Sequence, residues 1–114
     1  MSKDVEASGV ARSALPVAIL AALSLQPTHG YALIEILNSY GFPDLKGGTL
    51  YPLLARLEQQ GLIQSQWNHD QSGPGRKIFT TTGQGHFLLD AAIQAWDDMG
   101  RNLKELSTRG EATP

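Results

Sequence analysis

The chain has 114 residues, with 9 lysines and arginines, 11 aspartates and glutamates, and no cysteine. This length supplies one domain with a modest core, which a subunit interface can enlarge. The lack of cysteine excludes disulfides, thiol catalysis and cysteine-based zinc sites. No apolar run reaches the ~20 residues that a membrane span needs, and residues 1–9 lack the apolar segment of a signal peptide, so we expect a cytoplasmic protein.

The charge is distributed unevenly along the chain. A formal net charge of −2 argues against a protein that binds nucleic acid through overall attraction. Between residues 45 and 81, however, four basic residues outnumber two acidic ones, whereas between residues 84 and 106 four acidic residues outnumber two basic ones. The sequence therefore predicts a basic face in the middle of the chain and an acidic C-terminal segment.

The N-terminal part changes character near residue 12. Residues 1–11 are mostly small and polar and have no periodicity, so we expect a flexible tail. Residues 13–25 are apolar on all sides, which predicts a helix that is buried from several directions. Pro16 falls in the first turn if this helix begins near Ser13.

A second helix is predicted from His29 to Tyr40. Thr28 is the candidate for its N-cap, and Gly41 ends it. In the loop that follows, Pro43 prevents simple continuation of the helix. Helices joined by short connections in this way form the helix-turn-helix arrangement, in which the third helix is the one that reads DNA.

The third helix is expected to begin at about Gly48 or Thr49 and to end at Gly61. Pro52 is tolerated early in a helix, and Gly61 adopts the left-handed conformation at no steric cost. One face of the helix carries leucines at the i, i+3, i+4 and i+7 positions, namely Leu50, Leu53, Leu54 and Leu57. The other side carries Thr49, Tyr51, Arg56 and Gln60. One face therefore covers a core, and the other either enters a DNA groove or simply faces solvent.

A β-hairpin is predicted after Gly61, where the period changes from helical to alternating. Residues 62–67 and 76–81 alternate as strands do, and the turn-rich residues 68–75 join them. This hairpin is the wing of a winged helix. Arg76 and Lys77 can reach DNA phosphates from the wing, or they are ordinary charges at a strand edge.

A long final helix is predicted after Thr82, which can cap it. Its apolar residues alternate spacings of three and four, as in the seam of a coiled coil: Leu89, Ala92, Trp96, Met99, Leu103 and Leu106. A domain this small has little surface left to bury such a seam. We therefore expect the same helix of a second subunit to cover it, together with the apolar first helix.

Several stretches resemble one family: HGYAL at 29–33, GTLYPLLARLEQQGLI at 48–63 and GPGRKIFTTTGQGHFLL at 73–89. They are similar to PadR-family transcriptional regulators, specifically the small subfamily with a single C-terminal dimerisation helix. Trp67 and Trp96 add a similarity to the multidrug-sensing repressors of that subfamily. The resemblance implies a homodimeric repressor that binds a palindromic operator and is released by a small aromatic, phenolic or drug-like effector.

The expected fold is mainly α with a small β-hairpin, a winged helix-turn-helix followed by a long C-terminal dimerisation helix. The expected parts are a flexible tail at 1–11, the DNA-binding domain at 12–81, the dimerisation helix at 82–107 and a second flexible tail at 108–114. 

The candidates for DNA binding are Lys46, Thr49, Tyr51, Arg56, Arg76 and Lys77. Phosphate contacts would position the protein, and a few side chains would read bases. For Arg56 two alternatives to base reading stay open, an ion pair with Glu58 or a position against the helix stem.

Trp96 is the first candidate for effector binding. Its place in the seam would bring two indole rings together near the dimer axis, where a flat apolar molecule can stack between them. The alternative is a bulky side chain that only fills the seam. The further candidates are Ala92, Met99, Leu15 and Ile19 as apolar walls and Asp97 or Asp98 for a cationic effector.

A rival from another functional class is a winged helix that serves only as a protein-interaction or dimerisation module, which the near-neutral charge keeps open. An enzyme is not expected, because the hydroxyl groups of Thr80, Thr81 and Thr82 stand at a strand end without a positioned base. No cofactor and no metal are expected either. The three histidines form no i, i+4 pair, and no cysteine can join them.

Overall fold

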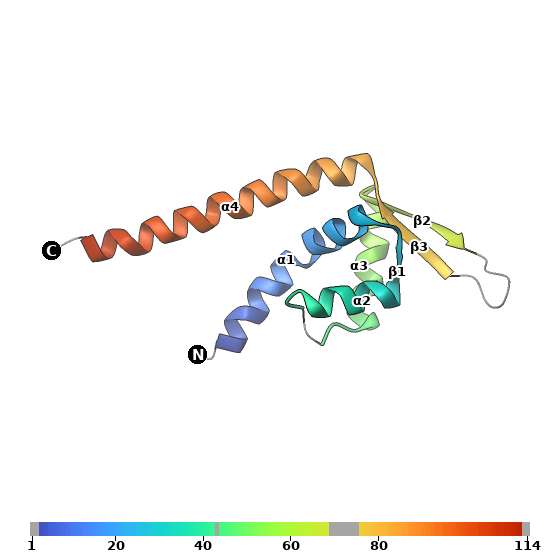
Figure 1. The fold of residues 1–114 in the computed structure, drawn as a ribbon, viewed down its shortest axis with the longest axis horizontal. Helices are drawn as coiled ribbons and strands as arrows, with labels where there is room; N and C mark the ends of the chain where they lie inside the picture. The colour runs from blue at the N-terminus through green and yellow to red at the C-terminus, as the bar shows by residue number, and fades with distance from the viewer. Residues whose placement is uncertain (1–2, 43, 69–75, 113–114) are drawn as a thin grey trace.

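The computed structural model describes residues 3–42, 44–68 and 76–112. In chain order the elements are α1 (Lys3–Leu25), β1 (Thr28–His29), α2 (Gly30–Ser39), α3 (Gly47–Gln59), β2 (Ile63–Asn68), β3 (Arg76–Thr81) and α4 (Gly83–Ala112). Helices α1, α2 and α3 pack together beside the small sheet, and α4 runs away from them as one long rod (Figure 1). This is the winged helix-turn-helix with a long C-terminal helix that the sequence predicts.

Helix α1 begins at Lys3, so the predicted start near Ser13 is wrong. The apolar pattern begins later than the helix because periodicity reports burial and not helicity: Gly9 and Val10 are helical but exposed. Pro16 consequently lies inside the helix and not in its first turn. Its missing N–H deprives the carbonyl four residues earlier of its usual hydrogen bond.

Helix α2 is capped by His29 and not by Thr28, which corrects the prediction for this end. His29 Nδ1 accepts a hydrogen bond from the backbone N–H of Ala32 at 3.3 Å. Thr28 instead belongs to β1, and its hydroxyl donates to the carbonyl of Gln26 at 2.9 Å. Because Thr28 pairs with β3 as part of β1, it does not cap the helix, and the next residue, His29, does so.

Helix α3 buries the leucine face that the spacing predicts. Leu50, Leu54 and Leu57 are buried, and Leu53 packs against the same core. The helix starts at Gly47, so Pro52 lies in its second turn, slightly deeper than expected. Gly61 follows with a positive φ of 78°, which confirms its predicted left-handed conformation.

The sheet has three antiparallel strands in the order β1-β3-β2. Strands β2 and β3 form the predicted hairpin, with Ile63 opposite Thr81 and Asn68 opposite Arg76. Asn68, which we expected in the loop, is therefore the last residue of β2, and the rest of the predicted loop, 69–75, lies outside the described residues. The third strand, β1, places His29 opposite Ile78 and so ties the start of α2 to the wing.

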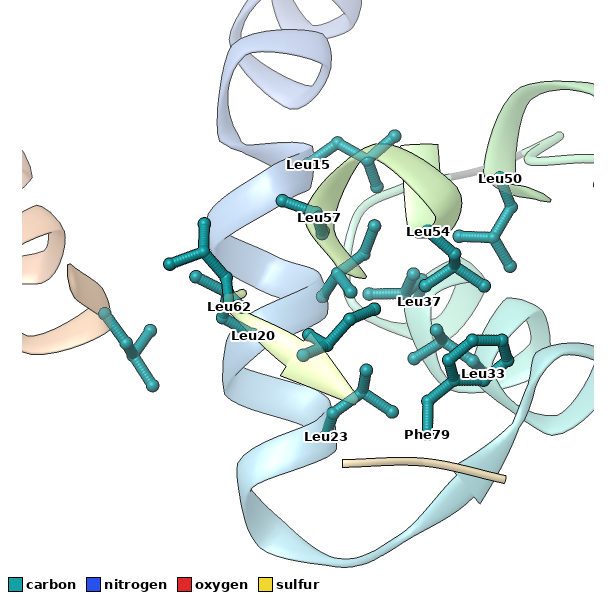
Figure 2. Close-up of a cluster of buried hydrophobic side chains, with 13 residues drawn as sticks. Leu15, Leu20, Leu23, Leu33, Leu37, Leu50, Leu54, Leu57, Leu62 and Phe79 are labelled. Atoms are coloured by element: carbon teal, nitrogen blue, oxygen red, sulfur yellow. The ribbon is translucent and has the colours of Figure 1, made fainter. Parts of the chain in front are cut away.

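The core lies between α1, α2, α3 and the sheet. Figure 2 shows its leucines and Phe79 converging from these elements: the buried apolar residues are Leu15, Ile19, Leu20, Leu23, Leu33, Leu37, Leu50, Leu54, Leu57, Leu62, Ile63, Phe79 and Leu89. Leu89 is the member that α4 contributes. Through this side chain the base of the long helix joins the core of the winged domain.

Thr82 caps the start of α4, as the sequence predicts. Thr82 Oγ1 accepts a hydrogen bond from the N–H of Gly85 at 3.1 Å, and the Thr82 hydroxyl donates to the carbonyl of Gly61 at 2.7 Å. The helix continues to Ala112, so the tail predicted from residue 108 is helical over most of its length. Among the described residues, no helix is both long and apolar enough to cross a membrane.

Candidate nucleic-acid interface

The outer face of α3 carries polar side chains that are free to make contacts. Thr49 and Arg56 are exposed, as is Lys46, which occupies the N-cap position without a side-chain cap bond. Over residues 3–42, 44–68 and 76–112, the Arg56 side chain has no hydrogen bond or ion pair. The alternative of an ion pair with Glu58 is not what the structure adopts, because Glu58 is engaged elsewhere.

Tyr51 leaves this face and packs back toward α2. A Cβ atom added at Gly30 would lie 2.5 Å from Tyr51 Oη and 2.7 Å from its Cε1, and one added at Gly47 would lie 3.1 Å from Cε2. The tyrosine ring therefore rests on two glycines, one at the start of α2 and one at the start of α3. This contact requires the absence of a side chain at Gly30, and it fixes how α3 lies against α2.

A cleft of 460 Å³ opens between the start of α2, helix α3 and strand β3. Its lining mixes aromatic and charged groups: His29, Gly30, Tyr31, Tyr51, Leu54, Ala55, Glu58, Arg76, Lys77 and Phe79. Three of the six residues that the sequence nominates for DNA binding, Tyr51, Arg76 and Lys77, meet here. The other three lie outside the cleft.

Glu58 connects α3 to the wing. Its Oε1 lies 3.9 Å from Lys77 Nζ, and its Oε2 accepts a hydrogen bond from the Ser65 hydroxyl at 2.5 Å. Lys77 Nζ also lies 5.9 Å from the centroid of the Phe79 ring, within the range of a cation–π contact. Because the Lys77 and Glu58 side chains are 45% and 34% exposed, the pair adds only about 0.2–1 kcal/mol. Lys77 can therefore exchange Glu58 for a phosphate at small cost.

His29 and Arg76 form the other edge of the cleft. Arg76 Nη1 lies 3.4 Å from His29 Nε2, while His29 Nδ1 caps α2. His29 thus serves both the cap of α2, which the sequence analysis assigned to Thr28, and the edge of the cleft. The position of His29 beside Arg76 was not predicted, because a two-residue strand such as β1 has no periodicity to reveal it.

The predicted seam of α4 is largely open in the single chain. Trp96, Met99, Leu103 and Leu106 are 42%, 54%, 58% and 64% exposed. Leu88 and Ile93, which the prediction left out, are exposed as well. Leu89, by contrast, is buried in the core of its own chain, so the open part of the seam begins after it.

The residues nominated for effector binding do not all meet in one chain. Leu15 and Ile19 belong to the core, where they are 7% and 0% exposed, so they offer little surface to an effector. Asp97 is exposed on α4, whereas Asp98 pairs with Arg101 and accepts a hydrogen bond from Gln94. Within the described parts of the chain, no three histidine or acidic side chains come together as a metal site.

An exposed third helix beside a two-stranded wing defines a winged helix-turn-helix protein. The model of the transcriptional regulator PadR-like family matches residues 19–91. The chain therefore belongs to the PadR-like family of transcriptional regulators, a class that regulates through DNA binding, and its relatives are regulators and not enzymes.

Individual relatives agree with this assignment. The transcriptional regulator Rv3488 of Mycobacterium tuberculosis is 30% identical over 92 residues, which cover 81% of this chain and 84% of the relative. The structure of a PadR family regulator from Eggerthella lenta is similar with a TM-score of 0.79 and 35% identity, covering 86% of this chain and 85% of that one. A PadR-like regulator from Bacillus cereus has a TM-score of 0.78 and 30% identity, covering 87% and 96%.

Proposed function

We propose that this protein is an effector-responsive repressor that binds a palindromic operator as a homodimer. Two reading helices and two wings make the contacts with DNA. The observation that carries the proposal is the polar face of α3, where Lys46, Thr49 and Arg56 are exposed, next to the cations Arg76 and Lys77 of the wing. In this arrangement a helix enters the major groove and the wing reaches the neighbouring backbone.

DNA binding by this protein depends on local and not overall charge. Two chains of −2 each give a dimer of −4, so attraction to DNA has to come from the face that carries α3 and the wing. If each subunit makes three or four phosphate contacts, the logarithm of the binding constant falls with the logarithm of salt concentration with a slope of about −5 to −7.

The test is a salt series of binding measurements with the DNA upstream of the protein's own gene. A slope in the expected range, together with preference for this DNA over a random duplex, supports operator binding. A slope near zero, or no DNA complex at any salt concentration, contradicts the proposal and favours a winged helix that serves only in protein interaction.

The effector site of the proposed dimer lies at Trp96. Pairing of two α4 helices through their exposed apolar row brings two Trp96 rings near the dimer axis, with Ala92 and Met99 beside them. A flat aromatic or phenolic molecule stacks between the rings, and Asp97 is available to a cationic effector. Binding there changes the angle between the α4 helices and so the spacing of the reading helices, which must match one DNA turn of ~34 Å.

Replacement of Trp96 tests this site. In Trp67→Phe protein, Trp96 is the single fluorescent tryptophan, so its emission reports the binding of compounds such as quinoline and naphthol. We expect quenching in Trp67→Phe protein and, by calorimetry, about a tenfold loss of affinity in Trp96→Ala. Unchanged affinity and unchanged release of DNA in Trp96→Ala would show that the effector binds elsewhere.

A further inference from the structure

The start of α2 and the wing bring two nitrogen donors together. Strand β1 lies beside β3 (Figure 1). His29 is opposite Ile78, and Arg76 lies two residues before Ile78 on β3. Arg76 Nη1 lies 3.4 Å from His29 Nε2. Both side chains line the cleft between α2, α3 and β3.

The hydrogen bonds of His29 determine which ring nitrogen carries the proton. The Ala32 N–H contact with Nδ1 and the Arg76 Nη1 contact with Nε2 both have hydrogen-bond geometry, but a neutral ring has one acceptor nitrogen, so only one of the two bonds can form. The cap of α2 favours Nδ1 as that acceptor. A neutral imidazole has one N–H and one acceptor nitrogen, which leaves the proton on Nε2. In the alternative, Nδ1 carries the proton and Nε2 accepts a hydrogen bond from Arg76. That arrangement leaves the N–H of Ala32 without its cap, and the N–H groups of a first helical turn have few other partners. The exposed Arg76 guanidinium, in contrast, can bond to water.

With this tautomer, Nε2–H of His29 and the guanidinium of Arg76 are two donors side by side, and neither has another hydrogen-bond acceptor among the described residues. Two donors cannot bond to each other, but both can bond to the oxygens of one anion. Lys77 and the ring of Tyr51 line the same cleft. Glu58, the carboxylate of this lining, is already engaged by Lys77 and Ser65.

We propose that His29 Nε2–H and Arg76 together bind one phosphate group of the DNA backbone. The inference rests on the proposed DNA binding and deepens it, since it adds His29 to the contacts and gives the α2 cap a second role, which is to fix the ring proton on Nε2. The cleft is a suitable place for a phosphate because it lies between the reading helix and the wing. The phosphate backbone of one strand passes between a helix in the major groove and a wing in the neighbouring minor groove.

The central test compares His29→Asn with Arg76→Gln in DNA binding. Asparagine is as good an N-cap residue as any, so His29→Asn keeps α2 capped but removes the ring N–H. We expect His29→Asn to lower the affinity of the dimer about tenfold or more at unchanged thermal stability and unchanged salt slope, because a neutral ring displaces no counterion. Arg76→Gln should lower the affinity and reduce the magnitude of the slope by about 2 for the two subunits.

The double variant distinguishes a shared phosphate from two separate contacts. When both residues hold one phosphate, the loss in His29→Asn/Arg76→Gln is smaller than the product of the two single losses. Arg101→Gln on α4, far from the cleft, is the matched control and should bind as the wild type does. The proposal is overturned if the affinity loss of the double variant equals the product of the two single losses, or if His29→Asn binds DNA with wild-type affinity.

A second measurement separates failure of this inference from failure of the proposed function. In the ¹⁵N spectrum of the imidazole, we expect the proton on Nε2 and a shift of that signal when inorganic phosphate or a short random duplex is added. A response to the duplex at lower concentration than to free phosphate identifies the DNA backbone as the source of the anion, whereas a response to free phosphate alone points to a small phosphorylated compound and overturns the proposal as stated. If the wild type binds no DNA, the proposed function and this inference both fail; if it binds DNA and the ring proton is on Nδ1, only the inference fails.

Discussion

Gly85 is a position in α4 where a side chain does not fit. A Cβ atom there would lie 2.1 Å from the backbone oxygen of Leu62 and 2.7 Å from Cγ2 of Thr81. The N–H of the same glycine bonds to Thr82 Oγ1. The close approach of α4 to the end of the hairpin thus depends on a missing side chain, although glycine weakens a helix by up to ~1 kcal/mol relative to alanine.

Gly85→Ala should destabilise the protein by about 2 kcal/mol, because a backbone carbonyl cannot move aside as a flexible side chain can. Urea unfolding measures the change. Gly83→Ala is the matched control: it lies in the same turn, its Cβ meets open space, and it should be neutral or raise stability by about 0.5 kcal/mol. Equal stability of the two variants would contradict the close approach at Gly85.

His29 shows which kind of contact the sequence could not predict. The sequence placed the cap of α2 at Thr28, one residue before His29, and the contact of His29 with Arg76 spans 47 positions of the chain. Only the pairing of β1 with β3 creates this contact, and no local pattern encodes it. The charges of the cleft were therefore predicted in part, as Arg76 and Lys77, while Glu58 and His29 were missing from the predicted site.

Among the elements, α3 and the hairpin were predictable because each buries one face and leaves the other exposed. The leucines of α3 recur at helical spacing, and the residues of the wing alternate. Residues 9–12 of α1 gave no such signal because they lie outside the buried core, with Gly9, Val10 and Arg12 exposed. Periodicity therefore located the elements where they touch the core and missed them where they do not.

The link between α3 and β3 through Glu58 leads to a prediction at this scale. Glu58→Gln keeps an oxygen for the Ser65 hydroxyl but removes the carboxylate from the cleft and releases Lys77. We expect DNA affinity to rise about three- to tenfold, because a repulsive charge is lost and a lysine is gained for phosphate contacts. Stability should change by less than about 1 kcal/mol, as is usual for an exposed pair.

A salt series checks this prediction, since a released Lys77 should steepen the salt dependence by about 2 for the dimer. Glu105→Gln on α4 makes the same chemical change far from the cleft and serves as the control. If Glu58→Gln instead bound DNA more weakly, the carboxylate would be needed to position the wing, and its repulsion of phosphate would be secondary.

At the scale of the molecule, two faces serve two purposes. The winged domain carries the exposed cations of α3 and β3, whereas the described part of α4 carries Asp90, Asp97 and Asp98 along with its apolar row. The chain is elongated, with extents of 70 × 31 × 20 Å, because α4 leaves the domain after Leu89 (Figure 1). The apolar row stays exposed against all the residues that the structure describes, which supports a second copy as its partner.

Leu103→Lys should therefore disrupt the proposed dimer without unfolding the winged domain. Leu103 is 58% exposed and lies beyond the core, so the lysine costs little in a single chain, whereas a dimer would have to bury two charges in its seam. We expect the dissociation constant of the dimer to rise by at least about a hundredfold, since two buried leucine contacts of about 2 kcal/mol each are lost as well. Operator affinity falls with it, because a monomer engages only one half-site at a time.

Sedimentation over a concentration series measures the change in assembly. Glu105→Lys places the same residue two positions further along α4, about 200° around the helix from Leu103, and so outside the seam. It should leave the dimer intact. A Leu103→Lys protein that remains dimeric would show that α4 does not form the interface, and a monomeric wild type would remove the homodimer from the proposed mechanism. The two lysine variants thus locate the subunit contact on one face of one helix, which is the feature on which the spacing of the two reading helices depends.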